Sequence, residues 1–289
     1  MKGIVLAGGS GTRLLPLTGA FSKQLLPIFD KPMVMYPIAT LMAAGIKEIA
    51  IITTPTDRPL FEKLLGDGSK FGVQFTFLIQ EQPRGIPEAF LIAEEFINNE
   101  SVALILGDNI FYGTGLGRDL AKYTNINGAK IFGYRVSNPS DYGVIELDDI
   151  GNILSIEEKP KNPKSNYVIP GLYFFDKSVC SISRELQPSS RGELEIVDVI
   201  QAYSSRTLLS VSILPRGTAW LDTGSPENLL DAANFVRVIQ TRQGIQIASL
   251  EEIAWRQGWI SKEQMINLGL SSNISYRNYL LNLENENRP

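Results

Sequence analysis

A glycine-rich segment near the N-terminus, Leu6-Ala-Gly-Gly-Ser-Gly-Thr-Arg-Leu14, directly follows a strand-like apolar run. Glycines at a strand end let backbone N–H groups approach phosphate oxygens without obstruction by Cβ atoms. Arg13 belongs to this segment, and Lys23 follows in the run Phe21-Ser-Lys-Gln-Leu-Leu-Pro27. Several amides and two cations near one strand end suit a triphosphate, so the segment predicts a phosphate-binding loop.

Two common kinds of phosphate loop do not match this segment. The dinucleotide fingerprint Gly-x-Gly-x-x-Gly, started at Gly9, requires glycine at position 14, which is Leu14. The P-loop form requires Gly-Lys-Ser/Thr, and no such tripeptide follows. A dehydrogenase with a Rossmann fingerprint is therefore a weak alternative.

The composition limits the available chemistry further. The chain of 289 residues has no histidine and one cysteine, Cys180. Ser-His-Asp and Cys-His catalysis, histidine metal ligands and an intramolecular disulfide are thereby excluded. Catalysis must rely on carboxylates, cations, backbone amides or a metal, and Cys180 is expected to be a buried structural thiol.

The charge and the hydropathy pattern limit the partners. A net charge of −4 and a pI of about 5.2 argue against a nucleic-acid binder. No apolar run approaches the roughly 18 residues needed to span a bilayer, and the start Met-Lys-Gly is unlike a signal peptide. We expect a cytoplasmic protein with no membrane partner.

Short β-branched runs alternate with segments of helical spacing in the first half of the chain. The apolar runs are 3–7, 49–53, 102–106 and 130–134, and the helical segments are 35–44, 59–65 and 87–97. This alternation predicts a doubly wound, mostly parallel, Rossmann-like α/β sheet flanked by helices, with ligands at the carboxyl ends of the strands.

The pattern changes along the rest of the chain. From about Tyr142 a hairpin-like alternation and a further strand at 171–175 predict an antiparallel extension of the sheet. After about Ser225, four helical segments follow, with capping-box patterns at Ser249 and Ser261. We expect one domain, 1–289, with a core at 1–141, an antiparallel part at 142–224 and a helical tail at 225–289.

Two aspartates are candidate metal ligands. Asp108 comes directly after the apolar run 102–106, where a carboxylate at the end of a central parallel strand is well placed for a ligand site. Asp222 lies in Trp220-Leu-Asp-Thr-Gly224. Taken singly, each is more often a turn or cap residue, and spacing alone does not bring them together.

The ordered motifs resemble those of the sugar nucleotidylyltransferase superfamily, and most closely its thymidylyltransferase branch. They begin with the glycine-rich segment, Ser22-Lys-Gln-Leu-Leu-Pro-Ile28 and Asp30-Lys-Pro-Met33. The later motifs cover nearly all the rest: Leu65-Gly-Asp-Gly-Ser69, Gly107-Asp-Asn-Ile-Phe-Tyr-Gly113, Glu157-Glu-Lys-Pro160, Arg191-Gly-Glu-Leu-Glu195 and Trp220-Leu-Asp-Thr-Gly224.

The resemblance implies a reaction. It is the Mg²⁺-dependent transfer of a nucleotidyl group from dTTP to α-D-glucose 1-phosphate, giving dTDP-glucose and pyrophosphate, a first step toward dTDP-L-rhamnose and related deoxysugars. It also implies a homotetramer. A phosphate monoester is already an anionic nucleophile, so the reaction needs no general base, which agrees with the missing histidine.

The resemblance also implies roles for individual residues. Asp108 and Asp222 match the two metal-coordinating carboxylates, and the cations match groups that neutralise the reacting phosphates. The implied catalytic residues are Arg13, Lys23, Lys159 and Arg191. The implied nucleotide-binding residues are Gly8, Gly9, Ser10, Gly11, Thr12, Arg13, Lys23, Gln80, Pro83, Gly85 and Asp108. The implied sugar-binding residues are Asn109, Tyr142, Gly143, Glu158, Lys159, Val168, Tyr173 and Arg191.

Two positions depart from the family pattern. Arg84 stands where the family frequently has aspartate, and Pro170 stands where threonine is frequent. The first change bears on base preference, and the second removes a backbone donor beside the sugar. Two alternatives stay open: an enzyme that uses UTP or CTP, and a nucleotide-sugar-binding module without catalysis.

Overall fold

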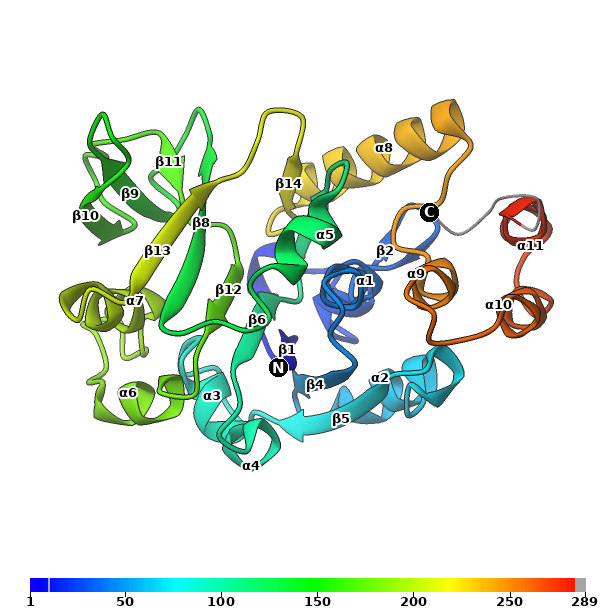
Figure 1. Cartoon of the computed structure of the whole chain (residues 1–289), viewed down its shortest axis with the longest axis horizontal. Coiled ribbons are helices and arrows are strands. Elements are labelled where there is room, and N and C mark those ends of the chain that lie inside the picture. The colour runs from blue at the N-terminus through cyan, green and yellow to red at the C-terminus, as the bar shows by residue number, and fades with distance from the viewer. Residues whose placement is uncertain (10, 284–289) are drawn as a thin grey trace.

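A single ten-stranded mixed sheet forms the centre of the molecule (Figure 1). The computed structural model describes residues 1–9 and 11–283. Four neighbouring strands, in the order β6-β1-β4-β5, are parallel. Their bounds are β1 Lys2–Leu6, β4 Glu48–Thr53, β5 Gln74–Ile79 and β6 Val102–Leu106. The predicted parallel core is confirmed.

The other half of the sheet is largely antiparallel. Strand β12 pairs antiparallel with both β6 and β8, and β13 runs parallel to β8. Strands β11, β9 and β10 continue the sheet in antiparallel pairs beyond β8. The bounds are β8 Ala129–Arg135, β9 Gly143–Leu147, β10 Ile153–Glu158, β11 Tyr167–Val168, β12 Leu172–Phe175 and β13 Leu209–Ile213. The predicted antiparallel extension is therefore present.

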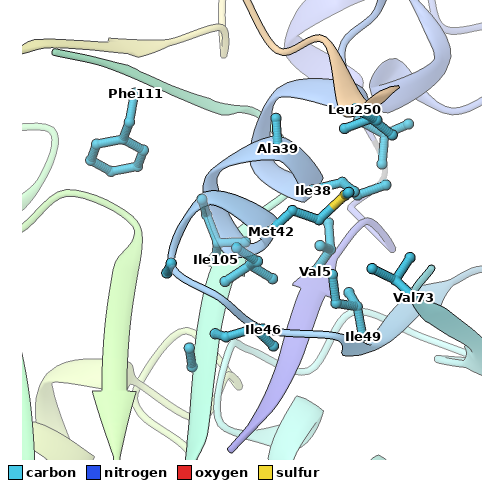
Figure 2. Close-up of a cluster of buried hydrophobic side chains, with 14 of the residues drawn as sticks. Val5, Ile38, Ala39, Met42, Ile46, Ile49, Val73, Ile105, Phe111 and Leu250 are labelled. Atoms are coloured by element: carbon cyan, nitrogen blue, oxygen red, sulfur yellow. The ribbon is translucent and has the colours of Figure 1, made fainter. Parts of the chain in front are cut away.

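Helices cover both faces of the parallel half, because successive side chains of its strands point to opposite faces. Val5 belongs to the buried cluster under α1 (Met35–Ala43), α2 (Arg58–Leu65), α5 (Leu116–Ala121) and α9 (Leu250–Arg256). Ile4 belongs to the cluster on the other face, under α3 (Glu88–Ile92), α4 (Glu94–Ile97), α6 (Val179–Glu185) and α7 (Ile196–Ser205). Figure 2 shows Val5, Ile49 and Ile105 of the sheet packed against Ile38 and Met42 of α1. The continuous apolar strands are thus explained by burial on both sides.

Of the helices before the tail, α1, α2 and the pair α3 and α4 lie near the predicted segments 35–44, 59–65 and 87–97, whereas α5, α6 and α7 were not predicted. Their bounds are α1 Met35–Ala43, α2 Arg58–Leu65, α3 Glu88–Ile92, α4 Glu94–Ile97, α5 Leu116–Ala121, α6 Val179–Glu185 and α7 Ile196–Ser205. The expected single helix over 87–97 is divided at Ala93, which has φ −92° and ψ 10°. Three short 3₁₀ helices are Thr12–Leu14, Lys23–Leu25 and Ser69–Phe71.

The helical tail contains α8 Pro226–Gln243, α9 Leu250–Arg256, α10 Lys262–Gly269 and α11 Ile274–Asn282. The capping box at Ser261 is confirmed, with Gln264 as its reciprocal partner. At Ser249 only half of the pattern forms, since the Glu252 carboxylate instead accepts hydrogen bonds from Tyr279 and Arg256. No helix in the described part of the chain is long and apolar enough to cross a membrane.

Two small two-stranded sheets complete the fold. Strand β2 Pro27–Ile28 pairs with β3 Lys31–Pro32, and β7 Asn109–Tyr112 pairs antiparallel with β14 Ala219–Asp222. The second pair joins segments far apart in sequence directly beyond the end of β6. This pair positions the acidic side chains described next.

Candidate active site

The β7–β14 pair brings the two candidate metal ligands together at the carboxyl end of the parallel strands. Strand β6 ends at Leu106, Asp108 precedes β7, and the antiparallel register sets Asp222 opposite Asn109. The next residue, Thr223, fixes this arrangement, because its backbone N–H and its hydroxyl both donate to the Asp108 carbonyl, at 3.1 and 2.8 Å. The site therefore lies where an open α/β sheet binds its ligands.

Asn109 holds the surroundings of Asp108 in place. Its side-chain Nδ2 donates to Asp108 Oδ1 at 2.8 Å. Its Oδ1 accepts from the Gly171 amide at 3.0 Å and from the Trp220 indole at 2.6 Å. The buried amide at the start of β7 thus joins the residue before β12 to β14, and it orients the carboxylate of Asp108.

The charges around the two carboxylates differ. Lys23 Nζ donates to Asp108 Oδ2, and both side chains are almost buried. Burial alone would raise the pKa of Asp108, but the Lys23 ammonium and the hydrogen bonds of Lys23 and Asn109 hold it below its usual value. Burial and the negative charge of Asp108 raise the pKa of Asp222.

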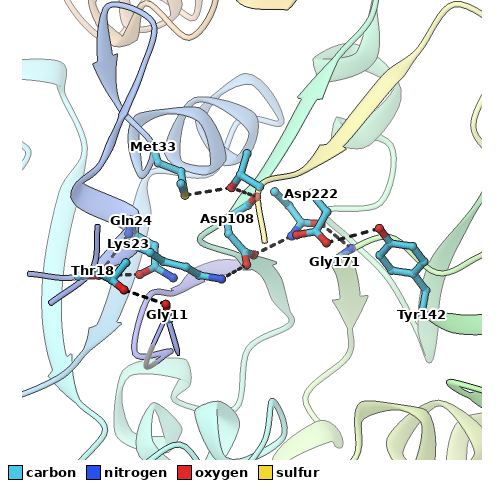
Figure 3. Close-up of polar contacts among 12 residues, drawn as sticks. Gly11, Thr18, Lys23, Gln24, Met33, Asp108, Tyr142, Gly171 and Asp222 are labelled. Carbon is cyan, nitrogen blue, oxygen red and sulfur yellow. Dashed lines mark hydrogen bonds and ion pairs between the residues drawn. The ribbon is translucent and has the colours of Figure 1, made fainter. Parts of the chain in front are cut away.

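The residues fit a divalent cation. The Asp108 carboxylate raises the pKa of Asp222, so the two repel each other in a buried setting, and a bound cation would relieve that repulsion. No group of three or more acidic or cysteine side chains that could hold a metal occurs in the described residues. A two-carboxylate site leaves positions for phosphate oxygens and water, which suits Mg²⁺. Figure 3 shows Lys23, Asp108, Asp222 and Tyr142 in one row of polar side chains, and the Tyr142 hydroxyl donates to Asp222 Oδ2 at 3.5 Å.

Three adjoining cavities meet at these residues. We name them after the ligand parts that the resemblance described above implies for their lining residues: the sugar cavity, of about 370 Å³, the base cavity, of about 190 Å³, and the phosphate cavity, of about 240 Å³. Asp108 lines both the sugar and base cavities, Arg13 lines both the sugar and phosphate cavities, and Lys23 lines both the base and phosphate cavities. The three cavities are therefore neighbours that share charged side chains.

The glycine-rich segment forms the wall of the phosphate cavity. Gly9, Gly11, Thr12, Arg13 and Lys23 line it, whereas Gly8 does not. Ser10 lies outside the described residues. Gly11 has φ +62°, a conformation that glycine adopts without strain. Across the cavity lies Gly224, where a Cβ would come within 2.9 Å of Arg13 Nη2.

The base cavity is lined by both apolar and polar residues. Leu6, Pro83 and Ile86 are apolar, and Gln80 supplies a side-chain amide. Gly85 has φ +103° and forms a bridge with Leu194, whose carbonyl would lie 2.0 Å from a Cβ at this position. Only glycine allows this approach, which brings Glu193 to the cavity as well.

The sugar cavity contains most of the predicted sugar-binding residues. Asn109, Tyr142, Gly143, Glu158, Lys159 and Tyr173 line it. Burial raises the pKa of Glu158 against the lowering effect of Lys159. Lys159 Nζ lies 3.8 Å from Glu158 Oε1.

Two predicted sugar-binding residues are not among those lining the cavity. Val168 is fully buried in the core as part of β11, and its neighbour Ile169 lines the cavity in its place. Arg191 lies beside the cavity and forms ion pairs with Glu195 at 2.7 Å and Glu158 at 3.4 Å. The Arg191 guanidinium therefore lies next to the cavity residue Glu158, and the ion pairs that it forms are with the carboxylates of Glu158 and Glu195.

Several lining residues were not predicted from sequence. They include Ile86, Asp141, Ile169, Ile196, Trp220, Ser225 and Asn228 in the sugar cavity and Glu193 in the other two. Ser225 had a usable signal, because a serine before Pro226 marks a helix start. Glu193 lies at the site because the neighbouring Leu194 forms a bridge with Gly85, and no local sequence pattern predicts this long-range bridge.

Comparison with known proteins shows the protein family to which this chain belongs. The nucleotidyl transferase family matches residues 2–238, and the chain belongs to this family. The chain is 55% identical to a glucose-1-phosphate thymidylyltransferase of Mycolicibacterium smegmatis. The alignment spans 284 residues and covers 98% of this chain and 99% of the relative.

Solved structures agree with this classification. One from Bacillus anthracis, assigned as a glucose-1-phosphate thymidylyltransferase and complexed with sucrose, is similar with a TM-score of 0.76 and 38% identity, over 82% of this chain and 95% of that one. A UDP-glucose pyrophosphorylase complexed with UDP-glucose is similar with a TM-score of 0.73 and 26% identity, over 82% and 98%. The doubly wound α/β fold predicted from sequence is thus confirmed.

Proposed function

We propose that this protein transfers the thymidylyl group of dTTP to α-D-glucose 1-phosphate, releasing pyrophosphate and forming dTDP-glucose. The observation that carries the proposal is the meeting of Asp108, Asp222, Lys23 and Arg13 where three cavities join. The high identity to thymidylyltransferases over the whole chain supports the choice of substrates.

The reaction brings two anions together, and the chain's cations address that difficulty. An oxygen of the sugar phosphate attacks the α-phosphorus in line, and the bond from that phosphorus to the bridging oxygen of the leaving pyrophosphate breaks. Arg13 and Lys23 stabilise the triphosphate and the charge that develops on the leaving group. Lys159, which lines the sugar cavity, orients the attacking phosphate. No proton moves, so no general base is required.

Asp108 and Asp222 would hold Mg²⁺, which supplies charge neutralisation to the phosphates. The Lys23 ammonium now contacts Asp108 Oδ2 and therefore shares the carboxylate with any bound cation. Gln80 and the Gly85 backbone face the pyrimidine in this assignment, and Tyr142, Glu158 and Tyr173 face the hexose. Cytoplasmic location stays a prediction from the sequence, and tetrameric assembly stays an expectation that the family resemblance implies.

A substrate panel tests the proposal. Purified protein is incubated with glucose 1-phosphate, Mg²⁺ and dTTP, UTP or CTP in turn, and pyrophosphate and the nucleotide sugar are both measured. We expect the highest kcat/KM with dTTP and no release in EDTA. Asp222→Asn should lower kcat by about 10²-fold or more, as loss of a transition-state contact does.

Asp141→Asn is the matched control, because Asp141 lines the same cavity but is not paired with Asp108. It should retain most of the activity. A strong preference for CTP or UTP would overturn the assignment of the nucleotide. Ligand binding without pyrophosphate release under any condition would favour a binding module over an enzyme.

A further inference from the structure

We propose that Glu88 is a positioning residue for the base cavity. It holds the Gln80 amide with its carbonyl oxygen away from Glu88 and free to accept from a ligand, and through Gln80 it favours a pyrimidine with an N3–H donor over cytosine. This inference rests on the proposed function, since it takes the base cavity to hold the base of the nucleotide.

Gln80 is held by a backbone hydrogen bond and by burial of its side chain. Its backbone N–H donates to the Thr53 carbonyl at 2.8 Å, which continues the β4–β5 pairing by one residue. The residue is 3% exposed, and it lines the base cavity. Its side chain therefore has little freedom except rotation of the terminal amide.

Glu88 removes that remaining freedom. Its Oε2 accepts from Gln80 Nε2 at 2.7 Å. A carboxylate offers only acceptors, so the nitrogen of the amide must face it. The reversed amide would place two acceptor oxygens in contact, which costs the hydrogen bond and adds repulsion. The orientation of Gln80 thus follows from the chemistry of its neighbour.

The opposite side of the amide is left as a free acceptor. Gln80 Oε1 lies 2.7 Å from the position that a Cβ of Gly8 would occupy, so the missing side chain at Gly8 makes room for it. Within the described residues, no side chain or backbone group donates a hydrogen bond to Gln80 Oε1. It is available to a donor on a ligand.

Arg84, which departs from the family pattern, contacts the same carboxylate. Its backbone N–H donates to Glu88 Oε2 at 3.3 Å, and its Nε lies 3.5 Å from Glu88 Oε1. The Arg84 side chain is 66% exposed, so it does not enter the base cavity. Aspartate at this position would set a second negative charge against Glu88, whereas arginine balances it.

The chemistry of the bases gives the selectivity. Thymine and uracil carry a donor, N3–H, on the ring edge between two carbonyls, and a fixed acceptor can engage it. Cytosine carries a bare lone pair at N3, which a fixed acceptor repels. An amide free to rotate could turn its nitrogen to cytosine and would lose this discrimination.

The test compares dUTP with dCTP, because these nucleotides differ only at the base edge. The ratio of their kcat/KM values is measured with glucose 1-phosphate for the wild type and for Glu88→Ala, Glu88→Gln and Arg84→Ala. We expect the dUTP:dCTP ratio to fall about fivefold or more in Glu88→Ala, which corresponds to one net hydrogen bond. Arg84→Ala should leave the ratio within about twofold, because Gln80 keeps its partner.

Glu88→Gln keeps the size of the side chain but offers Gln80 a donor as well as an acceptor, so the Gln80 amide can reverse and the ratio should fall in this variant too. This variant covers the case in which Glu88→Ala does not fold, because a wild-type ratio in Glu88→Gln would then overturn the inference. An unchanged ratio in a folded Glu88→Ala, with both nucleotides slowed equally, would overturn the inference and leave Glu88 a purely structural role. A wild type that turns over neither nucleotide would instead contradict the proposed function.

Discussion

Replacement of Gly224 by alanine tests whether the position of Arg13 matters. A Cβ at residue 224 would lie 2.9 Å from Arg13 Nη2 and 3.1 Å from Asp222 Oδ1. Because comfortable contacts begin at about 3.5 Å, the guanidinium must retreat by roughly 0.6 Å. A displacement of about 1 Å in a reacting site can cost about 10²-fold, so kcat/KM should fall about 10- to 100-fold.

Stability should not fall with activity. The atoms that must move are the ends of the Arg13 and Asp222 side chains rather than backbone, and Gly224 is not among the glycines with positive φ. Alanine at such a position stabilises by about 0.4–1 kcal/mol through the unfolded chain. Thermal unfolding should therefore show an equal or higher Tm for Gly224→Ala.

A double-mutant cycle identifies the cause. If the substitution acts through Arg13, then adding Gly224→Ala to Arg13→Ala should lower kcat/KM by no more than about threefold, the remainder acting through Asp222. The kcat/KM for glucose 1-phosphate is measured from pyrophosphate release at saturating dTTP. An equal loss in both backgrounds, or wild-type turnover by the single variant, would refute the reasoning.

Three further outcomes follow from the same geometry. Asn109→Ala leaves the buried Gly171 amide and Trp220 indole without an acceptor, at about 1–3 kcal/mol each. Urea titration should therefore show a free energy of unfolding lower by about 2–6 kcal/mol, and a change below about 1 kcal/mol would contradict this role. Burial raises the pKa of the Cys180 thiol to about 11, so at pH 8 the thiolate is scarcer than usual, and a disulfide reagent should label native protein at least about 100-fold more slowly than unfolded protein. Burial and the charge of Asp222 raise the pKa of Tyr142 to about 12, so its hydroxyl stays protonated through pH 10. The pH–rate profile of Tyr142→Phe should therefore keep the alkaline limb of the wild type. Loss of a limb near pH 10 in this variant would count against a Tyr142 hydroxyl that stays protonated.

The sequence predicted the parts of the fold that depend on local pattern. Continuous apolar runs identified β1, β4 and β6 because both faces of the parallel half are buried. The glycine-rich loop was placed correctly because it directly follows β1. The division between α3 and α4 was missed, since nothing in the apolar spacing around Ala93 signals a break.

The site was less accessible to sequence reasoning. Asp222 faces Asp108 only because β14 pairs with β7, and that pairing depends on long-range register. The hydrogen bonds of Asn109 to Gly171 and Trp220 are equally long-range. Val168 was expected beside the sugar, but this last residue of β11 is buried in the core, and the next residue, Ile169, lines the cavity.

Glu88 illustrates the same limit from the other side. In sequence it is an ordinary acidic residue in the first turn of a helix, which is where such residues favour the helix dipole. Its bond to Gln80 appears only when the end of β5 and the start of α3 are folded together. Arg84, which looked like an isolated departure, acquires a partner by the same folding.

The stereochemical course at the α-phosphorus tests the central claim most directly. The account has one direct in-line displacement by the sugar phosphate, with no nucleophile or general base from a chain that lacks histidine. With a single diastereomer of α-thio-dTTP and glucose 1-phosphate, the nucleotide sugar should form with inversion of configuration at phosphorus. Net retention would require two displacements through a covalent enzyme intermediate, and it would contradict the account.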